Sequence, residues 1–215
     1  MRPLLRITPI LISLVLGAPF ALSKDLTATE LKELQTKMQQ SDALTVDFLQ
    51  TSYTALRGKS RQRRGRAQFS KEGKFKWMLE TPMKEYKIYD GTNFYDFSPD
   101  ANSAVRYAQA GDHASELKQI VDLVLNMDTL LKKYELVEAK DFGDSVHVRL
   151  RPKDAATDLV LVELIMDLKK SYISSLKFDL RNKNTLTHEF SKPNREPLPA
   201  GTFSIPQGVK ITDSH

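Results

Sequence analysis

Few side chains in this sequence are placed to catalyse a reaction. The acidic residues are numerous but scattered, and the nearest thing to an acid–base pair, Asp96 and Asp100, flanks a turn signal. The sequence contains no phosphate-binding glycine loop, no dinucleotide fingerprint and no serine-nucleophile motif. We therefore expect a protein that is not an enzyme, with no catalytic residue and no cofactor. A hydrolase that uses scattered carboxylates is the weakest alternative.

The histidines and the missing cysteines also argue against a metal site. Four histidines are present, none of them at metal-ligand spacing from another: His113, His147, His188 and His215. His147 falls on the polar face of its expected strand, which is typical of a surface histidine. His188 falls on an apolar face, which favours a satisfied interior histidine over a catalytic one. The absence of cysteine excludes disulfides, thiolate ligands and a lipidated N-terminal cysteine.

The N-terminus has the layout of a secretory signal peptide. Residues 1–6 carry two arginines and no acid, residues 7–20 form an apolar run, and residues 21–23 supply small side chains for cleavage. The apolar run is too short for a comfortable membrane span. We therefore expect residues 1–23 to be removed. Residues 24–215 should form one exported, soluble, monomeric domain.

Hydrophobic periodicity in the remaining chain indicates a mostly β protein of the α+β class. Helical spacing appears twice, over residues 25–40, where Thr27 and Glu30 predict a capping box, and over residues 112–134. The rest alternates apolar and polar residues between short turns, including a hairpin at Asp90-Gly91. Strands that follow one another through short turns predict an antiparallel meander, a large one-sided sheet covered by the two helical regions.

A run of basic residues without an intervening acid stands out between the first two expected strands. It consists of Arg57, Lys59, Arg61, Arg63, Arg64 and Arg66. One interpretation is contact with anionic phospholipid headgroups or an acidic partner protein. The alternative is a solvated hairpin end. Nucleic acid is disfavoured because aromatic residues do not interleave with the run and the net charge is only +5.

Several short motifs, taken in order, resemble the LolA family of periplasmic lipoprotein carriers over roughly residues 31–211. They are Val46-Asp47-Phe48-Leu49-Gln50, Gly65 at the start of a strand, Phe75-Lys76-Trp77, Thr81-Pro82, Asp90-Gly91 with Phe94-Tyr95, Leu150-Arg151-Pro152-Lys153, and residues 203–209. Lys71 and Glu72 stand where the family commonly has Arg-Pro. Lysine lacks the planar fork of arginine, so a lid latch at Lys71 would be weaker than the family's.

The resemblance implies an incomplete antiparallel β-barrel, or strongly curved sheet, with a helical lid over an apolar cavity. It implies that the cargo is the acylated N-terminus of lipoproteins, received from an inner-membrane ABC transporter of the LolCDE type and passed to an outer-membrane acceptor of the LolB type. If the resemblance holds, twelve residues line the cavity: Phe48, Phe75, Trp77, Leu79, Ile88, Phe94, Val121, Val124, Leu125, Val148, Leu164 and Phe178.

Two non-enzymatic alternatives remain open at this stage. The chain could be a LolA-like paralogue that carries or senses another lipid or glycolipid. It could also be a β-sheet protein with a solid core that only binds partners. Sequence alone does not separate a hollow interior from a packed one.

Overall fold

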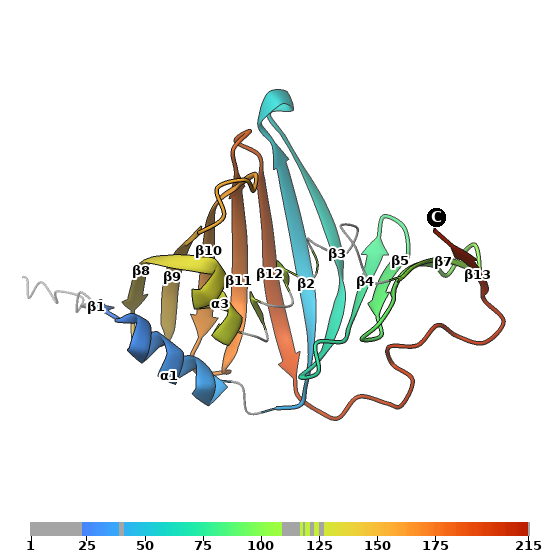
Figure 1. Cartoon of the computed structure of the whole chain (residues 1–215), viewed down its shortest axis with the longest axis horizontal. Coiled ribbons are helices and arrows are strands. Elements are labelled where there is room, and N and C mark those ends of the chain that lie inside the picture. The colour runs from blue at the N-terminus through green and yellow to red at the C-terminus, as the bar shows by residue number, and fades with distance from the viewer. Residues whose placement is uncertain are drawn as a thin grey trace, which may run out of the picture.

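A computed structural model describes residues 23–38, 41–108, 117, 119–120, 123–124 and 127–214 of the chain (Figure 1). Residues 1–22 of the expected signal peptide, His113 and His215 lie outside these residues. The elements run in the order β1 Lys24–Asp25, α1 Ala28–Met38, β2 Ala43–Thr54, a 3₁₀ turn η1 Ala55–Arg57, β3 Lys59–Ser70, β4 Phe75–Thr81, β5 Glu85–Tyr89, β6 Phe94–Ser98, β7 Ser103–Tyr107, α3 Met127–Lys133, β8 Tyr134–Asp141, β9 Ser145–Pro152, β10 Leu159–Asp167, β11 Tyr172–Leu180, β12 Thr185–Asn194 and β13 Lys210–Asp213.

The thirteen strands of the described residues form one large curved sheet. Its order is β1-β8-β9-β10-β11-β12-β2-β3-β4-β5-β6-β7-β13, and Figure 1 shows it as a continuous, strongly twisted surface. The predicted mostly-β architecture with few helices is confirmed. The sheet is open at β1 and β13, so it is a strongly curved sheet and not a closed barrel. One detail is corrected: β13 pairs parallel to β7, whereas the predicted meander is antiparallel throughout.

One face of the sheet carries most of the buried apolar side chains, and we call it the inner face. Strict alternation puts Val46 and Phe48 of β2 on this face, and cross-strand pairing continues it through β12 to β9 and through β3 to β4. Leu31 of α1 and Leu130 of α3 are buried in the same cluster. Figure 1 shows both helices lying across β8 to β11, so they cover one part of the inner face.

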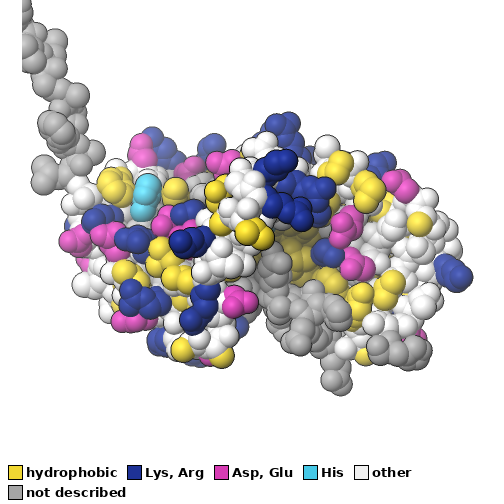
Figure 2. All heavy atoms as spheres, turned by 90° about the horizontal axis from the view of Figure 1, so that it is seen from above, with side chains coloured by type: hydrophobic (Ala, Val, Ile, Leu, Met, Phe, Trp, Pro, Cys, Tyr) yellow, Lys and Arg dark blue, Asp and Glu magenta, His cyan; other side chains and the backbone are white. Residues whose placement is uncertain are grey.

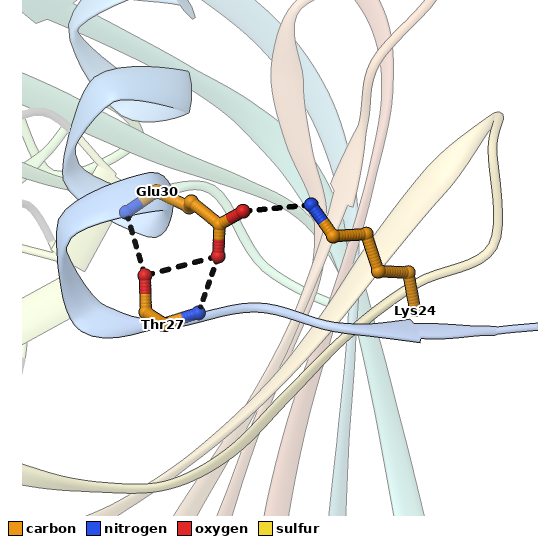
Figure 3. Close-up of polar contacts among 3 residues, drawn as sticks. All are labelled: Lys24, Thr27 and Glu30. Carbon is orange, nitrogen blue, oxygen red and sulfur yellow. Dashed lines mark hydrogen bonds and ion pairs between the residues drawn. The ribbon is translucent and has the colours of Figure 1, made fainter.

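A capping box fixes the start of α1, as the sequence predicts. The Thr27 amide and hydroxyl donate to Glu30 Oε2 at 2.8 and 2.9 Å, and the Glu30 amide donates to Thr27 Oγ1 at 3.2 Å. Lys24 Nζ adds an ion pair to Glu30 Oε1 at 2.7 Å (Figure 3). These contacts lower the pKa of Glu30 to about 2, led by the hydrogen bond from Lys24. The carboxylate therefore stays ionised at the positive end of the helix.

Gly65 allows two strands and an aromatic ring to approach one another closely. A Cβ at this position would lie 2.0 Å from the Met78 carbonyl oxygen and 2.7 Å from Phe48 Cζ. The pairing of β3 with β4 shifts register at this point, between Arg64 and Gly65. The Phe48 ring thus fills the space that a side chain would occupy, which is why this strand needs glycine.

The C-terminal segment packs on the opposite, outer face of β5, β6 and β7. Phe203, Ile205 and Val209 cover a small second cluster that contains Ile88 and Phe97. No helix of the described residues is long and apolar enough to cross a membrane.

Candidate functional site

An aromatic cluster occupies the centre of the inner face. Trp77 of β4 is only 2% exposed and stacks on Phe48 of β2, with ring centroids 4.0 Å apart. Phe69 and Phe190 meet the indole edge-on, at 6.5 and 6.3 Å between centroids. Offset and edge-to-face contacts of this kind add to the stability that burial of the rings provides. The cluster therefore fixes the middle strands of the sheet to one another.

Eight of the twelve residues predicted for the cavity lie together on the inner face. They come from six strands: Phe48, Phe75, Trp77, Leu79, Phe94, Val148, Leu164 and Phe178. Val124, in the helical region, packs against the same cluster. Val121 and Leu125 lie outside the described residues. A wide, buried apolar face is thus built from strands far apart in the sequence.

The placement of Ile88 on this face is wrong. Ile88 pairs with Lys76 and Tyr95, whereas Lys87 is the residue opposite Trp77. Since neighbouring residues of a strand point to opposite faces, Ile88 belongs to the outer face and is buried under the C-terminal segment. Both faces of this strand are covered, so the hydrophobicity of a residue does not predict the face on which it lies.

His188 lies among the aromatic rings, and only part of the prediction for it holds. It is interior, with 1% of its surface exposed, and its ring centroid lies 5.3 Å from that of Trp77. Its Nδ1 is buried, however, and makes no hydrogen bond. Burial lowers the pKa of His188 to about 3, because the protonated ring would lose its hydration. The ring is therefore neutral at the pH of most compartments.

This buried neutral ring makes folding sensitive to acid. The unfolded chain binds a proton near the ordinary histidine pKa of 6.5, whereas the folded chain does not until about pH 3. Above pH 6.5, His188 therefore does not lower the free energy of unfolding. Between pH 6.5 and about pH 3 that free energy falls by about 1.4 kcal/mol per pH unit. Urea unfolding at pH 7.5 and pH 5.0 measures how much unfolding free energy the protein loses on acidification. We expect this loss to be about 2 kcal/mol smaller in His188→Leu than in the parent chain. His147→Leu, at an exposed position, is the matched control and should leave that loss unchanged.

Charged side chains replace apolar ones where the inner face reaches β5 and β6. Lys87 Nζ contacts Asp96 Oδ1 at 2.7 Å and Glu85 Oε1 at 3.0 Å, and it lies 5.9 Å from the Phe94 ring centroid. Partial burial lowers the pKa of Lys87, but these hydrogen bonds outweigh it, so the pKa is raised. Sequence reasoning missed this group, although the Asp90-Gly91 hairpin sets a register that puts Lys87 beside Asp96.

The predicted latch residue lies at the turn between β3 and β4. Lys71 is exposed and its Nζ lies 3.7 Å from Asp42 Oδ1. In the part of the chain that the structure describes, this ion partner belongs to the segment before β2 and to neither helix. The latch to a helical lid stays a prediction.

The basic run does not form a single patch. Arg66 Nε donates to Asp47 Oδ1 at 2.9 Å, and Lys192 Nζ donates to the other oxygen of that carboxylate, also at 2.9 Å. Arg63 approaches Glu85 at 3.9 Å. Arg57, Lys59 and Arg61 lie exposed at the end of the β2–β3 hairpin. Asp47 of β2 therefore links β3, through Arg66, to β12, through Lys192.

Within the described residues, no group of three or more histidine or acidic side chains could hold a metal ion. The site that the structure describes is a broad, buried apolar face with a charged margin on β5 and β6.

Comparison with known proteins agrees with this arrangement. Residues 39–206 match the family model described as "Outer membrane lipoprotein carrier protein LolA". A protein of Chromobacterium violaceum named outer-membrane lipoprotein carrier protein is 24% identical over 214 residues, which covers 98% of each chain. A protein of Shewanella sp. strain W3-18-1 with the same name is 23% identical and covers 95% of each chain. Among solved structures, an uncharacterized conserved protein of Thermus thermophilus aligns with a TM-score of 0.57 and 10% identity. That alignment covers 88% of this chain and 100% of the other.

Proposed function

Because this chain belongs to the LolA family of outer membrane lipoprotein carrier proteins, we propose that it is an exported carrier of acylated lipoproteins. It holds the acyl chains against the inner face, in the periplasm, and ferries them from the inner to the outer membrane. The observation that carries this proposal is the inner face itself. Its buried apolar side chains extend without interruption from β9 through β12 and β2 to β4.

The energetics of acyl chains explain why such a carrier needs a broad face. Each buried methylene is worth about 0.8 kcal/mol, so a lipoprotein with two or more chains hardly ever leaves a membrane unaided. A carrier must offer comparable apolar area, and it must give that area up on delivery. Helices α1 and α3 lie on the inner face. Their movement between two positions would expose and cover it as a population shift.

The carrier role also sets the expected partners. A donor of the LolCDE type in the inner membrane would load the protein, and an acceptor of the LolB type would unload it. The carrier itself performs no chemical step in this scheme. Loading energy comes from the donor, which fits a sequence without a phosphate-binding loop.

Native mass spectrometry of the protein purified from periplasm without detergent tests this proposal. Added mass that matches an acylated lipoprotein is the expected result. Added mass that matches a simple lipid or glycolipid would replace it with the alternative of a LolA-like carrier for another amphiphile. A protein without added mass that also fails to bind a fluorescent acyl probe would contradict both.

A further inference from the structure

The end of the β2–β3 hairpin forms a projecting finger, which we define as residues 51–64. β4 pairs with β3 only from Arg64 to Phe69, so among the described strands residues 59–63 have no hydrogen-bonded neighbour on that side. Five residues of extended chain span about 16 Å. Figure 1 shows this hairpin reaching further than the neighbouring turn between β11 and β12.

An apolar side chain stands at the tip of the finger. Leu56, in the 3₁₀ turn η1, is 95% exposed, and Tyr53 on the adjoining strand is 38% exposed. Gly58 adopts the left-handed conformation with φ 58° and returns the chain into β3. The Ala55 amide donates to Asn184 Oδ1 at 2.9 Å, which ties the tip to the β11–β12 turn. The finger therefore presents leucine on a supported turn.

Cationic residues follow this leucine along the chain. The sequence has no acidic residue between Asp47 and Glu72, and the exposed side chains of Arg57, Lys59 and Arg61 belong to the finger. Figure 2, which looks down on this end of the molecule, shows Lys and Arg side chains gathered beside a hollow lined with apolar side chains. A cationic strand edge also discourages pairing with another chain.

We propose that the finger docks the protein on an anionic lipid surface, with Leu56 inserted among the acyl chains and Arg57, Lys59 and Arg61 at the headgroups. An exposed apolar tip next to several cations has the chemistry of an interfacial anchor. Each cation near such a surface strengthens binding by about fivefold, and Tyr53 suits the boundary between headgroups and hydrocarbon.

A protein partner fits the finger less well. A stable protein–protein interface buries about 800 Å² on each partner, which one leucine and one partly exposed tyrosine do not supply. A lipid surface requires no shape-complementary pocket and tolerates a small contact that forms and breaks quickly. This inference does not rest on the carrier function, because it concerns the outside of the molecule.

Vesicle co-sedimentation of the mature chain tests the inference. The vesicles contain zwitterionic phosphatidylcholine alone or with about 30 mol % anionic phosphatidylglycerol. We expect partitioning to the anionic vesicles that is at least tenfold stronger and that weakens in high salt. Leu56→Asp and the triple change Arg57→Gln, Lys59→Gln and Arg61→Gln should each weaken it by about tenfold or more.

Two matched controls separate the finger from general effects of charge and hydrophobicity. Ile211→Asp alters an exposed apolar residue on edge strand β13, and Lys37→Gln, Lys170→Gln and Lys210→Gln remove three exposed cations elsewhere. Both controls should partition like the parent chain. Equal losses in the controls, equal binding to both vesicle types, or no binding to either would overturn the inference. The last result would leave an acidic protein as the partner.

Discussion

Replacing Trp77 with alanine is expected to lower the free energy of unfolding by about 3–5 kcal/mol and to weaken acyl-chain binding by at least tenfold. Trp77 is nearly fully buried and touches the rings of Phe48, Phe69 and Phe190, so its removal leaves a large cavity in the inner face. Urea unfolding measures the first effect, and titration with a fluorescent acyl probe measures the second.

Ile88→Ala is the matched control for this prediction. Ile88 is as fully buried as Trp77 but lies on the outer face. Its truncation should cost about 2–5 kcal/mol of stability and leave the acyl affinity within about twofold. The contradicting outcome is a loss of acyl affinity that follows the loss of unfolding free energy equally in both variants. Trp77 would then be an ordinary core residue, and the inner face would not be the binding surface.

Substitution of Gly65 by alanine is expected to destabilise the protein by about 3 kcal/mol or more. The new Cβ would lie 2.0 Å from a backbone carbonyl oxygen on β4, so strands β3 and β4 must separate locally. Because the Phe48 ring also contacts this position, its stacking on Trp77 should be lost at the same time. Urea unfolding with near-UV circular dichroism of the aromatic residues measures both changes.

Gly58→Ala provides the comparison at a glycine without neighbours. Nothing lies within 4 Å of a Cβ there, although φ is +58°. The expected cost is only about 1 kcal/mol, from the left-handed backbone. A Gly65→Ala variant as stable as Gly58→Ala would contradict the close approach of the two strands.

The sequence predicts the strands that alternate regularly and misses those that do not. Regular alternation fails in β8, because its pairing with β9 shifts between Leu136 and Glu138. Tyr134, expected at the end of a helix, instead begins β8. The first half of β3 is polar because no neighbouring strand or helix covers it. Its pairing with β2 therefore leaves no hydrophobic signature, although β3 runs without interruption from Lys59 to Ser70.

Local spacing predicts the part of the candidate site that lies within one strand, but not the part that depends on contacts between distant strands. Phe75, Trp77 and Leu79 share a face by spacing alone, and the structure keeps them together. The buried His188 ring without a partner for Nδ1 depends on neighbours contributed by β2, β4 and β11, which no local pattern reveals. The division of the basic run between Arg66, paired with Asp47, and the exposed finger likewise requires three-dimensional contacts.

The only tryptophan of the chain lies at the centre of the proposed binding face, so its fluorescence reports directly on the central claim. Titration of the mature protein with brominated acyl chains should quench Trp77, since bromine quenches indole only near contact. Acyl chains that carry bromine at different carbon positions should quench Trp77 to different extents. Unbrominated chains should compete for the same site and restore the fluorescence. Saturable binding of the same acyl chains without quenching of Trp77 would place the lipid elsewhere and contradict the account.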